Sequence, residues 1–389
     1  MLNLEKCTGC MACMNVCPKD AIFEGKDENG FLVPQIEVDK CVNCGLCEKI
    51  CMANDIRESD CTIIKAYSLI VPDKEVLRNS SSGGAFSVLS DRVLAQGGLV
   101  VGCVMESDFT IHHIYVSTKD ERNRMRGSKY VQSDIGFMFR NIKKVLDNGL
   151  QVMFVGTPCQ VTGLMMFLRG KEYPNLLCVD LLCHGVSNND FFKEHIKYLE
   201  RKYDKKVVDY KFRHKRYGWR VGGPMEIVKY EGANYTTNIE VQNYAHFFYT
   251  YQSLRPSCHQ CRWRSPHRYS DITIGDYWDS QDEYEKNDTG VSLLCANTSK
   301  GISFVEIIKC YCLLKEVDLN RIIGRAEFSP PRNAKKIKHD YDEFWELYHL
   351  VGYEEVVKKY IHNSFYKKFK FLVKRIVKRN KHFLRGEIH

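Results

Sequence analysis

The sequence predicts an α/β protein, α+β overall. We expect a small cysteine-rich N-terminal domain, a larger α/β domain behind it, and a helical, basic C-terminal tail. Eight of the 18 cysteines lie within the first 51 residues. Apolar runs with the length of buried strands alternate with helical patterns between residues 61 and 186. From residue 340 the pattern is helical again, and residues 365–389 carry nine Lys or Arg against one Glu.

Length and composition limit the class of the protein. A chain of 389 residues accommodates two or three domains, and a hydrophobic content of 44% is enough for a large core. No apolar run has the length of a membrane span, and no basic leader with an apolar run precedes the first cysteine. The many cysteines then indicate a reducing, cytoplasmic location. The net charge of +9 comes almost entirely from the tail, so we expect no nucleic-acid partner.

The cysteines of the N-terminal domain form two runs of identical spacing. Each run reads C-x2-C-x2-C-x3-C, and a proline follows the first run. This spacing is typical of two cubane iron–sulfur clusters, in which the fourth cysteine of each run ligates the other cluster. The sequence therefore assigns one cluster to Cys7, Cys10, Cys13 and Cys51, and the second to Cys41, Cys44, Cys47 and Cys17.

Zinc and disulfide bonds are the alternatives for these eight cysteines. A four-thiolate zinc site usually uses two separated C-x2-C pairs, without the longer runs seen here. Disulfide frameworks belong mainly to small secreted domains, whereas this chain is long. The spacing favours iron–sulfur clusters over both.

The predicted elements follow in chain order. Residues 19–40, between the two cysteine runs, predict a β-hairpin with its turn at Gly30. We expect strands over 61–71, 98–105, 151–160 and 176–186, a Gly/Ser loop with a helix over 80–98, and helices over 136–149 and 162–170. This alternation predicts a largely parallel core sheet. A β-rich pattern follows over 205–295 and a helical one over 340–385. The predicted domains are 1–58, 61–335 and 336–389.

Four further cysteines occupy positions that suggest a site. Cys159 and Cys183 each lie at the end of a predicted strand, and Cys258 and Cys261 form a C-x2-C pair. Ligands of open α/β sheets gather at the carboxyl ends of strands, so these four thiols are candidates for a third cluster. In the alternative interpretation, Cys159 and Cys183 fill the core as small hydrophobic residues and the C-x2-C pair binds zinc.

Two loops are candidates for binding a phosphate or an aromatic ring. The loop Ser80–Gly84 opens a helix, where backbone N–H groups and the helix dipole favour an anion, although the same pattern is an ordinary helix cap. The segment 126–133 (RGSKYVQS) combines a cation, an aromatic ring and several hydrogen-bond donors, which also suits a solvated loop. Neither G-x-G-x-x-G nor a P-loop motif occurs, so a flavin would be held by another arrangement.

The order of the motifs resembles one family. After the cysteine runs come SSGGAFS, GSKYVQS, GTPCQVTGL, VDLLCHGVS, the C-x2-C pair and DITIGDYW. This combination, over about residues 1–330, resembles the beta subunits of the coenzyme F420 hydrogenase/dehydrogenase family. The resemblance implies FAD and iron–sulfur clusters, with electrons passing between ferredoxin-type carriers and a two-electron substrate through the flavin.

The resemblance also implies roles for individual residues. It places Ser82, Gly83 and Gly84 near the flavin phosphates, Ser128, Lys129, Tyr130 and Gln132 along the flavin, and Thr157, Pro158 and Gln160 in a turn beside it. Cys159, Cys183, Cys258 and Cys261 become the ligands of the third cluster. His184 and Asp276 are candidates for a proton donor and its orienting carboxylate. The alternative for His184 is a ring that only binds backbone.

The substrate and the partners stay open. The family motif around Cys183 continues with Asn188-Asn189 where proline is common, and relatives differ in what meets the flavin. Coenzyme F420 redox chemistry and surface polysaccharide synthesis are both candidate settings. The alternative function is an electron-transfer subunit that relays electrons to a partner enzyme without a substrate of its own. In either case we expect a ferredoxin or another redox protein as partner.

The basic tail has two interpretations. Phe365, Phe369, Leu372, Val373 and Ile376 recur at helical spacing among Lys and Arg. Such a helix binds the anionic inner face of a membrane as a peripheral contact. Alternatively, it docks a partner or stays solvated.

Overall fold

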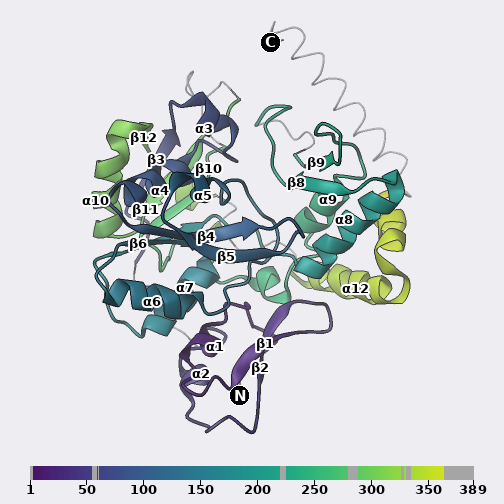
Figure 1. Cartoon of the computed structure of the whole chain (residues 1–389), viewed down its shortest axis with the longest axis horizontal. Coiled ribbons are helices and arrows are strands. Elements are labelled where there is room, and N and C mark those ends of the chain that lie inside the picture. The colour runs from purple at the N-terminus through teal and green to yellow at the C-terminus, as the bar shows by residue number, and fades with distance from the viewer. Residues whose placement is uncertain are drawn as a thin grey trace, which may run out of the picture.

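The computed structural model describes residues 3–54, 59, 61–219, 225–278, 288–325, 328–329 and 334–362. The amphipathic tail predicted over 365–389 lies outside these residues. Three parts are visible (Figure 1). An N-terminal module of residues 3–54 projects from a unit built around one large sheet, and an aromatic-rich unit of helices and a short hairpin stands beside that sheet.

The N-terminal module consists of one hairpin and two short helices. Strands β1 (Ile22–Lys26) and β2 (Leu32–Ile36) pair antiparallel, with Ile22 opposite Ile36. The hairpin turn is held by the side chain of Asp27, which accepts hydrogen bonds from the N–H groups of Asn29 and Phe31. Helices α1 (Ala12–Val16) and α2 (Leu46–Lys49) each follow a cysteine loop and pack against one another.

The central sheet has eight strands in the order β12-β3-β11-β10-β7-β6-β4-β5. The four strands β4 (Leu99–Met105), β6 (Val152–Gly156), β7 (Leu176–Leu181) and β10 (Ile272–Asp276) run parallel in its middle. Antiparallel pairing adds β5 (Ile111–Val116) on one side, and β11 (Ser292–Ala296), β3 (Lys65–Ile70) and β12 (Leu313–Val317) on the other. The inner strands are nearly continuous apolar runs because both sheet faces are covered.

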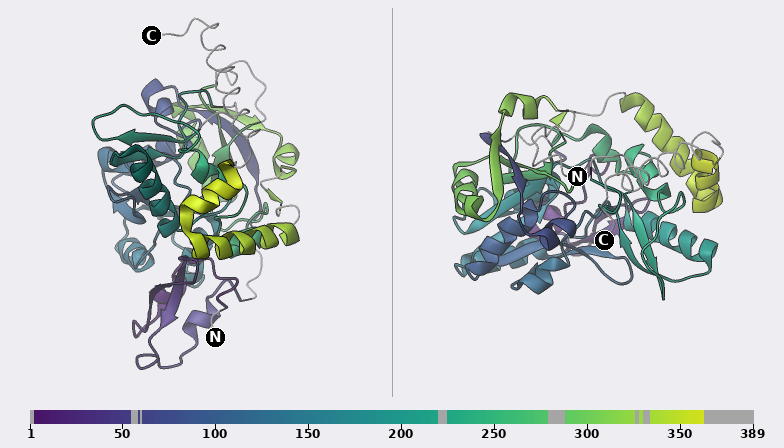
Figure 2. Two further views of the ribbon diagram at one scale, coloured as in Figure 1. Left: turned by 90° about the vertical axis from the view of Figure 1, so that its right-hand side faces the viewer. Right: turned by 90° about the horizontal axis from the view of Figure 1, so that it is seen from above.

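Helices cover both faces of this sheet (Figure 2). They are α3 (Lys74–Arg78), α4 (Ala85–Ala95), α5 (Lys119–Asn123), α6 (Met138–Asp147), α7 (Pro158–Leu168), α10 (Ser299–Ile308) and α11 (Leu319–Ile323), with a 3-10 turn at Lys309–Tyr311. Their apolar sides form two cores with the sheet, one containing Leu89 and Leu293 and the other containing Phe139 and Leu164.

The aromatic-rich unit is held together by ring contacts. It comprises α8 (Asn189–Tyr203), β8 (Val207–Lys211), β9 (Ile227–Tyr230), α9 (Asn243–Tyr249), α12 (Ala334–Val357) and the final turn Lys358–His362. A 3-10 turn η1 (Pro256–Gln260) connects α9 back toward β10. Phe191 of α8 contacts Phe344 and Trp345 of α12 at centroid distances of 5.7 Å. Trp345 in turn lies 5.9 Å from Phe31, so α12 also touches the hairpin of the N-terminal module.

The predicted fold class is confirmed, with local differences. The parallel core is present, but antiparallel strands extend it on both sides into a mixed sheet. The strand expected over 151–160 ends at Gly156, because Thr157 caps α7 and Pro158 occupies its first turn, a position that proline favours. Cys159 therefore lies in a helix rather than at a strand end. The region 205–295 contains α9 and η1 besides its strands. The domain boundaries stay a prediction.

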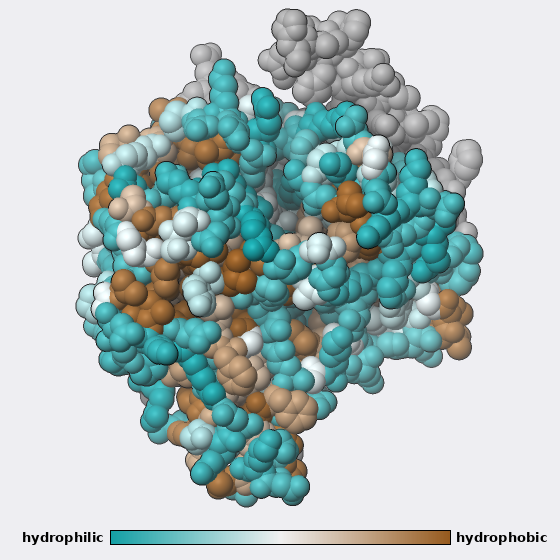
Figure 3. Space-filling view, in the orientation of Figure 1, coloured by the Kyte–Doolittle hydropathy of each residue, from teal (hydrophilic) through white to brown (hydrophobic). Residues whose placement is uncertain are grey.

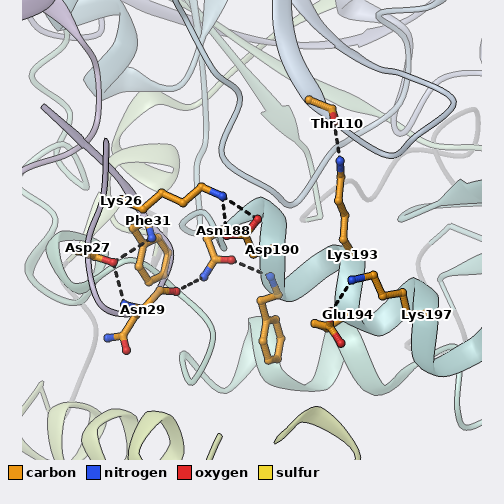
Figure 4. A network of polar contacts seen from close by, with 11 residues as sticks. Lys26, Asp27, Asn29, Phe31, Thr110, Asn188, Asp190, Lys193, Glu194 and Lys197 are labelled. Carbon is orange, nitrogen blue, oxygen red and sulfur yellow. Dashed lines mark hydrogen bonds and ion pairs between the residues drawn. The ribbon is translucent and has the colours of Figure 1, made fainter. Parts of the chain in front are cut away.

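The hairpin of the N-terminal module binds the start of α8 (Figure 4). Asn188 caps α8 by accepting from the N–H of Phe191 at 2.7 Å, and its side-chain amide donates to the carbonyl of Asn29 at 2.7 Å. Lys26 forms an ion pair with Asp190 in the same place. Asn188 thus joins the two parts of the chain.

The helices of the described residues can be compared with the length and polarity that a membrane span requires. In the part of the chain that the structure describes, every helix is too short or too polar to cross a membrane. Figure 3 shows one face, on which hydrophilic side chains predominate and hydrophobic ones form separate patches.

Candidate functional site

The first cysteine run forms a tight loop around the start of α1. Gly9 and Met11 have positive φ angles of 66° and 55°, which curl the backbone between Cys7 and Cys13. A Cβ on Gly9 would lie 2.2 Å from the Nε2 atom of Gln132 and 2.9 Å from the carbonyl of Leu32, so no larger residue fits. A small cavity lies inside this loop, and its lining includes Cys7, Cys10, Cys13 and Cys51.

The thiols around this cavity are close enough to affect one another. Burial raises the pKa of Cys10 to about 12, and the neighbouring Cys7 adds to the rise. Burial likewise raises the pKa values of Cys7 and Cys13, and Cys51 adds to both. Buried thiols of this kind become thiolates when they bind iron, because the metal replaces the proton. This arrangement fits the predicted set of Cys7, Cys10, Cys13 and Cys51.

The second run lies at the outer end of the module. Asn43 and Gly45 have φ angles of 51° and 70°, which shape the loop that leads into α2. Cys44 is exposed, and Cys17 and Cys47 pack on the same small apolar cluster as Met11 and Ile22. The predicted set of Cys41, Cys44, Cys47 and Cys17 is therefore more open to solvent than the first set.

The described side chains do not form a site for a single metal ion. No three His, Cys, Asp or Glu side chains among the described residues approach closely enough to hold one. A cubane is much wider than one ion, so its thiolates stand further apart than zinc ligands do. The spacing of the cysteines in the sequence suits clusters better than zinc.

The four remaining candidate cysteines come together from separate elements. Cys159 lies in the first turn of α7, Cys183 follows β7, and Cys258 and Cys261 lie in and directly after η1. Burial raises the pKa of Cys258 to about 12 and of Cys159 to about 11, with Cys261 adding to both. Burial also raises the pKa of Cys183, and the other three thiols add to the effect. These four thiols lie close to one another, beyond the carboxyl ends of β6 and β7, where ligands of such sheets gather.

This second location adjoins the first. Cys159 contributes to the raised pKa of Cys10, which places the two thiols near one another. Gly163, one turn further along α7, faces Cys10 directly: a Cβ there would lie 3.1 Å from the sulfur. Helices α1 and α7 pack together, so the module presents its first cysteine loop to the carboxyl edge of the sheet.

The two loops predicted to bind a phosphate also meet in space. The Oγ atom of Ser81 accepts from the N–H of Ser128 at 2.8 Å and bonds its hydroxyl at 2.9 Å. Gly83 lies against β3 and β11, since a Cβ there would be 2.0 Å from the carbonyl of Leu69. Ser82 binds the carbonyl of Val291, and Gly84 adopts a φ of 94° at the start of α4. Backbone that passes this closely requires glycine.

A lysine absent from the sequence-based site lies beside this loop. Lys215 donates to the carbonyls of Leu77 at 2.7 Å and Ser82 at 2.5 Å. Burial, followed by the nearby charge of Arg213, lowers the pKa of Lys215 to about 7. Lys215 lies in the stretch after β8 and belongs to no motif by which sequence reasoning could have found it.

Several predicted flavin residues have protein partners. Lys129 donates to the carbonyls of Met125 and Arg126 at the end of α5, and Tyr130 stacks on Phe248 at 4.5 Å. Thr157 and Gln160 form the capping box of α7, while Pro158 fills its first turn. Gln132 donates to the carbonyls of Thr8 and Gly9 in the cysteine loop. The contacts of Gln132 therefore give no support to its predicted place along a flavin.

His184 and Asp276 take part in different interactions. His184 lies among Phe248, Tyr249 and Tyr251, and burial lowers its pKa to about 4. Asp276 instead forms an ion pair with Arg213 and accepts from the indole N–H of Trp219 at 3.2 Å. These contacts do not join the two side chains as donor and orienting carboxylate. The Nε2 atom of His184 is buried and makes no hydrogen bond to the described protein, so its predicted role as a proton donor stays a prediction.

Comparison with known proteins bears on both parts of the chain. Residues 149–319 match the family model for the C-terminal part of the coenzyme F420 hydrogenase/dehydrogenase beta subunit, and residues 6–54 match that of the 4Fe-4S dicluster domain. No curated protein matches the chain. One solved structure, from the F420-reducing [NiFe] hydrogenase complex of Methanosarcina barkeri, is 16% identical, with a TM-score of 0.47, covering 76% of this chain and 95% of that chain.

The two family matches coincide with the two sulfur-rich parts of the structure. The dicluster match spans both cysteine runs of the module, and the other match includes Cys159, Cys183, Cys258 and Cys261. Electron transfer through iron–sulfur clusters is the chemistry that such a dicluster domain supports. The resemblance predicted from the motifs is confirmed: the chain joins a 4Fe-4S dicluster domain to a region that matches the beta subunit family of coenzyme F420 hydrogenase/dehydrogenase.

Proposed function

We propose that this protein is an iron–sulfur flavoprotein oxidoreductase that passes electrons between a one-electron redox protein and a two-electron substrate. The observation that carries the proposal is the meeting of Cys159, Cys183, Cys258 and Cys261 next to the first cysteine loop. A relay that ended in the N-terminal module would have no use for a second buried group of thiols behind it.

The positions of the thiols give the relay a direction in space. Cys44 is exposed at the outer end of the module, Cys13 is buried within it, and Cys159 and Cys183 lie behind the module, just after β6 and β7. We infer that Cys41, Cys44, Cys47 and Cys17 hold the cluster that meets the redox partner. Cys7, Cys10, Cys13 and Cys51 then hold the second, and the four deeper cysteines hold a third.

The flavin is proposed to bind at the Gly/Ser loop. FAD, when bound, accepts electrons singly and delivers them in pairs. Ser81 and Ser128 bring hydroxyl groups together at the start of α4, and the helix dipole there favours a phosphate. The amine of Lys215 donates a hydrogen bond to the carbonyl of Ser82 in the same loop.

The electron-transfer subunit without its own substrate is the second candidate function. It predicts the same clusters and no flavin. Mass identification of a yellow compound released from anaerobically purified protein distinguishes the two, because a pure relay releases none. Coenzyme F420 chemistry and polysaccharide synthesis remain candidate settings for the substrate, and assays with F420 separate them.

Iron analysis tests the clusters. The full chain should contain about twelve iron atoms with three clusters, or about eight if the deeper thiols hold none. Cys258→Ala should lose about four of them, because it removes one ligand of the deeper site. Cys310→Ala is the matched control, since that exposed thiol lies outside every proposed site and should change nothing. One or two metal ions per chain in the wild type would refute the proposal.

A further inference from the structure

An arginine that the predicted site did not include lies between the two inner groups of thiols. Arg255 immediately precedes η1, and its carbonyl accepts from the N–H of Cys258 at 2.9 Å. Its side chain extends toward the module, where one Nη atom donates to the carbonyl of Cys7 at 3.0 Å and the other to that of Leu32 at 2.5 Å. Arg255 therefore connects the C-x2-C element to the first cysteine loop.

Gln132 completes this connection. Its amide oxygen accepts from the Nε and Nη2 atoms of Arg255 at 3.0 and 2.7 Å, while its Nε2 atom donates to the carbonyls of Thr8 and Gly9. The guanidinium also lies over the ring of Phe31 at 5.2 Å. The carbonyls of Cys7, Thr8 and Gly9 in the cysteine loop thus accept hydrogen bonds from two side chains of the body of the protein, Arg255 and Gln132.

The charge of Arg255 has no carboxylate partner among the described residues. Its side chain is only 2% exposed, and its hydrogen bonds go to neutral carbonyl and amide oxygens. The comparably buried Arg122 and Arg268 pair with Asp91 and Asp180. A buried charge is costly unless an opposite charge balances it. The described residues around Arg255 therefore supply no negative charge to balance its guanidinium, and a bound group would have to supply one.

Thiol-bearing residues of both sites lie next to Arg255. Its guanidinium donates to the carbonyl of Cys7, and its own carbonyl accepts from the N–H of Cys258. Four thiolates around an iron–sulfur core give a unit with net negative charge. Such units on the two sides are the missing counter-charges.

We propose that Arg255 is a positioning and charge-balancing residue, shared by the site of Cys7, Cys10, Cys13 and Cys51 and the site of Cys159, Cys183, Cys258 and Cys261. This inference rests on the proposed function, because it requires clusters at both sites. Arg255 holds the two sites side by side, and its positive charge stabilises the more negative form of each. One electron from the redox partner adds one negative charge and forms or breaks no bond. Arg255 therefore raises both reduction potentials.

The test is a redox titration of the full-length, anaerobically purified protein, followed by electron paramagnetic resonance, with iron content measured in parallel. Arg255→Gln removes the charge and keeps a polar side chain, so both inner clusters should become harder to reduce. We expect at least a tenfold change in the reduction equilibrium, which is about 59 mV for one electron. Arg255→Lys keeps the charge and should restore most of the potential, although it cannot form the same fork of hydrogen bonds.

Two further variants keep the test decisive. Gln132→Glu retains an acceptor for Arg255 but neutralises its charge, so it should shift the potentials in the same direction even if Arg255→Gln fails to fold. Arg140→Gln is the matched structural control. Arg140 also donates to a carbonyl of the first cysteine run, that of Cys17 at 2.8 Å, but it is paired with Asp20 and partly exposed. It should leave the potentials of the two inner clusters unchanged.

The outcomes separate the two proposals. A wild-type protein without iron would refute the proposed function. Clusters present with inner potentials unchanged in both Arg255→Gln and Gln132→Glu would overturn the role of Arg255 and leave the proposed function intact. An equal shift in Arg140→Gln would show that loosened attachment of the module, rather than charge, sets the potentials.

Discussion

Single residues at the contact between module and body carry unusual protonation states. Glu24 on β1 faces Asp134, which lies in the loop that also contains Gln132. Burial, followed by the hydrogen bond with Asp134, raises the pKa of Glu24 to about 8 from an ordinary value of 4.5. The folded chain therefore binds a proton at neutral pH that the unfolded chain has already released.

This proton predicts a pH dependence of stability. Between about pH 4.5 and pH 8 the folded state binds more protons at Glu24, so the free energy of unfolding should fall as the pH rises. Glu24→Gln stays neutral and should remove this dependence. Because Glu24 is partly exposed, Glu24→Gln should raise the free energy of unfolding at pH 8 by only on the order of 1 kcal/mol relative to the wild type. Thermal unfolding of both proteins at pH 5.5 and 8 measures this difference. An equal change of stability with pH in the two proteins would contradict the raised pKa of Glu24.

At the scale of elements, the packing of α1 on α7 brings the sulfur sites together. The contact is close because Gly163 presents no side chain to Cys10: a Cβ would lie 3.0 Å from the Cβ of Cys10 and 3.4 Å from the ring of Phe139. Glycine has a low helix propensity, and this close contact explains why it occupies position 163 within α7.

Gly163→Val should push the two helices apart. Overpacking of a tight contact costs about 1–3 kcal/mol, and here the strain falls on the loop that holds Cys10. We expect lower iron content and faster proteolysis within the N-terminal module, measured by iron analysis and limited digestion. Met165→Val is the control, since it introduces the same β-branched residue in α7, where Met165 is only partly buried. Equal iron content in the two variants would show that the contact tolerates a side chain.

At the scale of the whole molecule, the sulfur sites differ in their access to solvent. Cys44 is exposed at the far end of the module, whereas Cys13 is buried and Cys10 and Cys159 are partly buried where the module meets the sheet unit. An iron chelator reaches the outer site without unfolding and reaches the inner ones only through local opening.

Iron should therefore leave the protein in at least two phases. The fast phase should correspond to about four iron atoms from the outer cluster, and the slow phase to the remainder. Cys41→Ala should abolish the fast phase and leave the slow one. Absorbance of the chelate over time measures both, and a single phase in the wild type would contradict the difference in access.

The sequence by itself determined the chemistry of the N-terminal module. The spacing of cysteines such as Cys7 and Cys10 is local, and a tight loop aims such thiols at one point whatever surrounds it. The same holds for the parallel strands around β6 and β7, whose apolar runs reflect burial on both faces. The positive φ of Gly9 likewise follows from a loop that must pass close to other atoms.

Only the tertiary structure decided which distant residues meet. Gln132 fits a flavin-lining motif by sequence, yet its amide binds the cysteine loop more than a hundred residues away. Arg255 and Lys215 belong to no motif, because their significance comes from burial beside particular carbonyls rather than from spacing. Local patterns encode short-range geometry, whereas the balance of buried charges depends on what the fold places around each one.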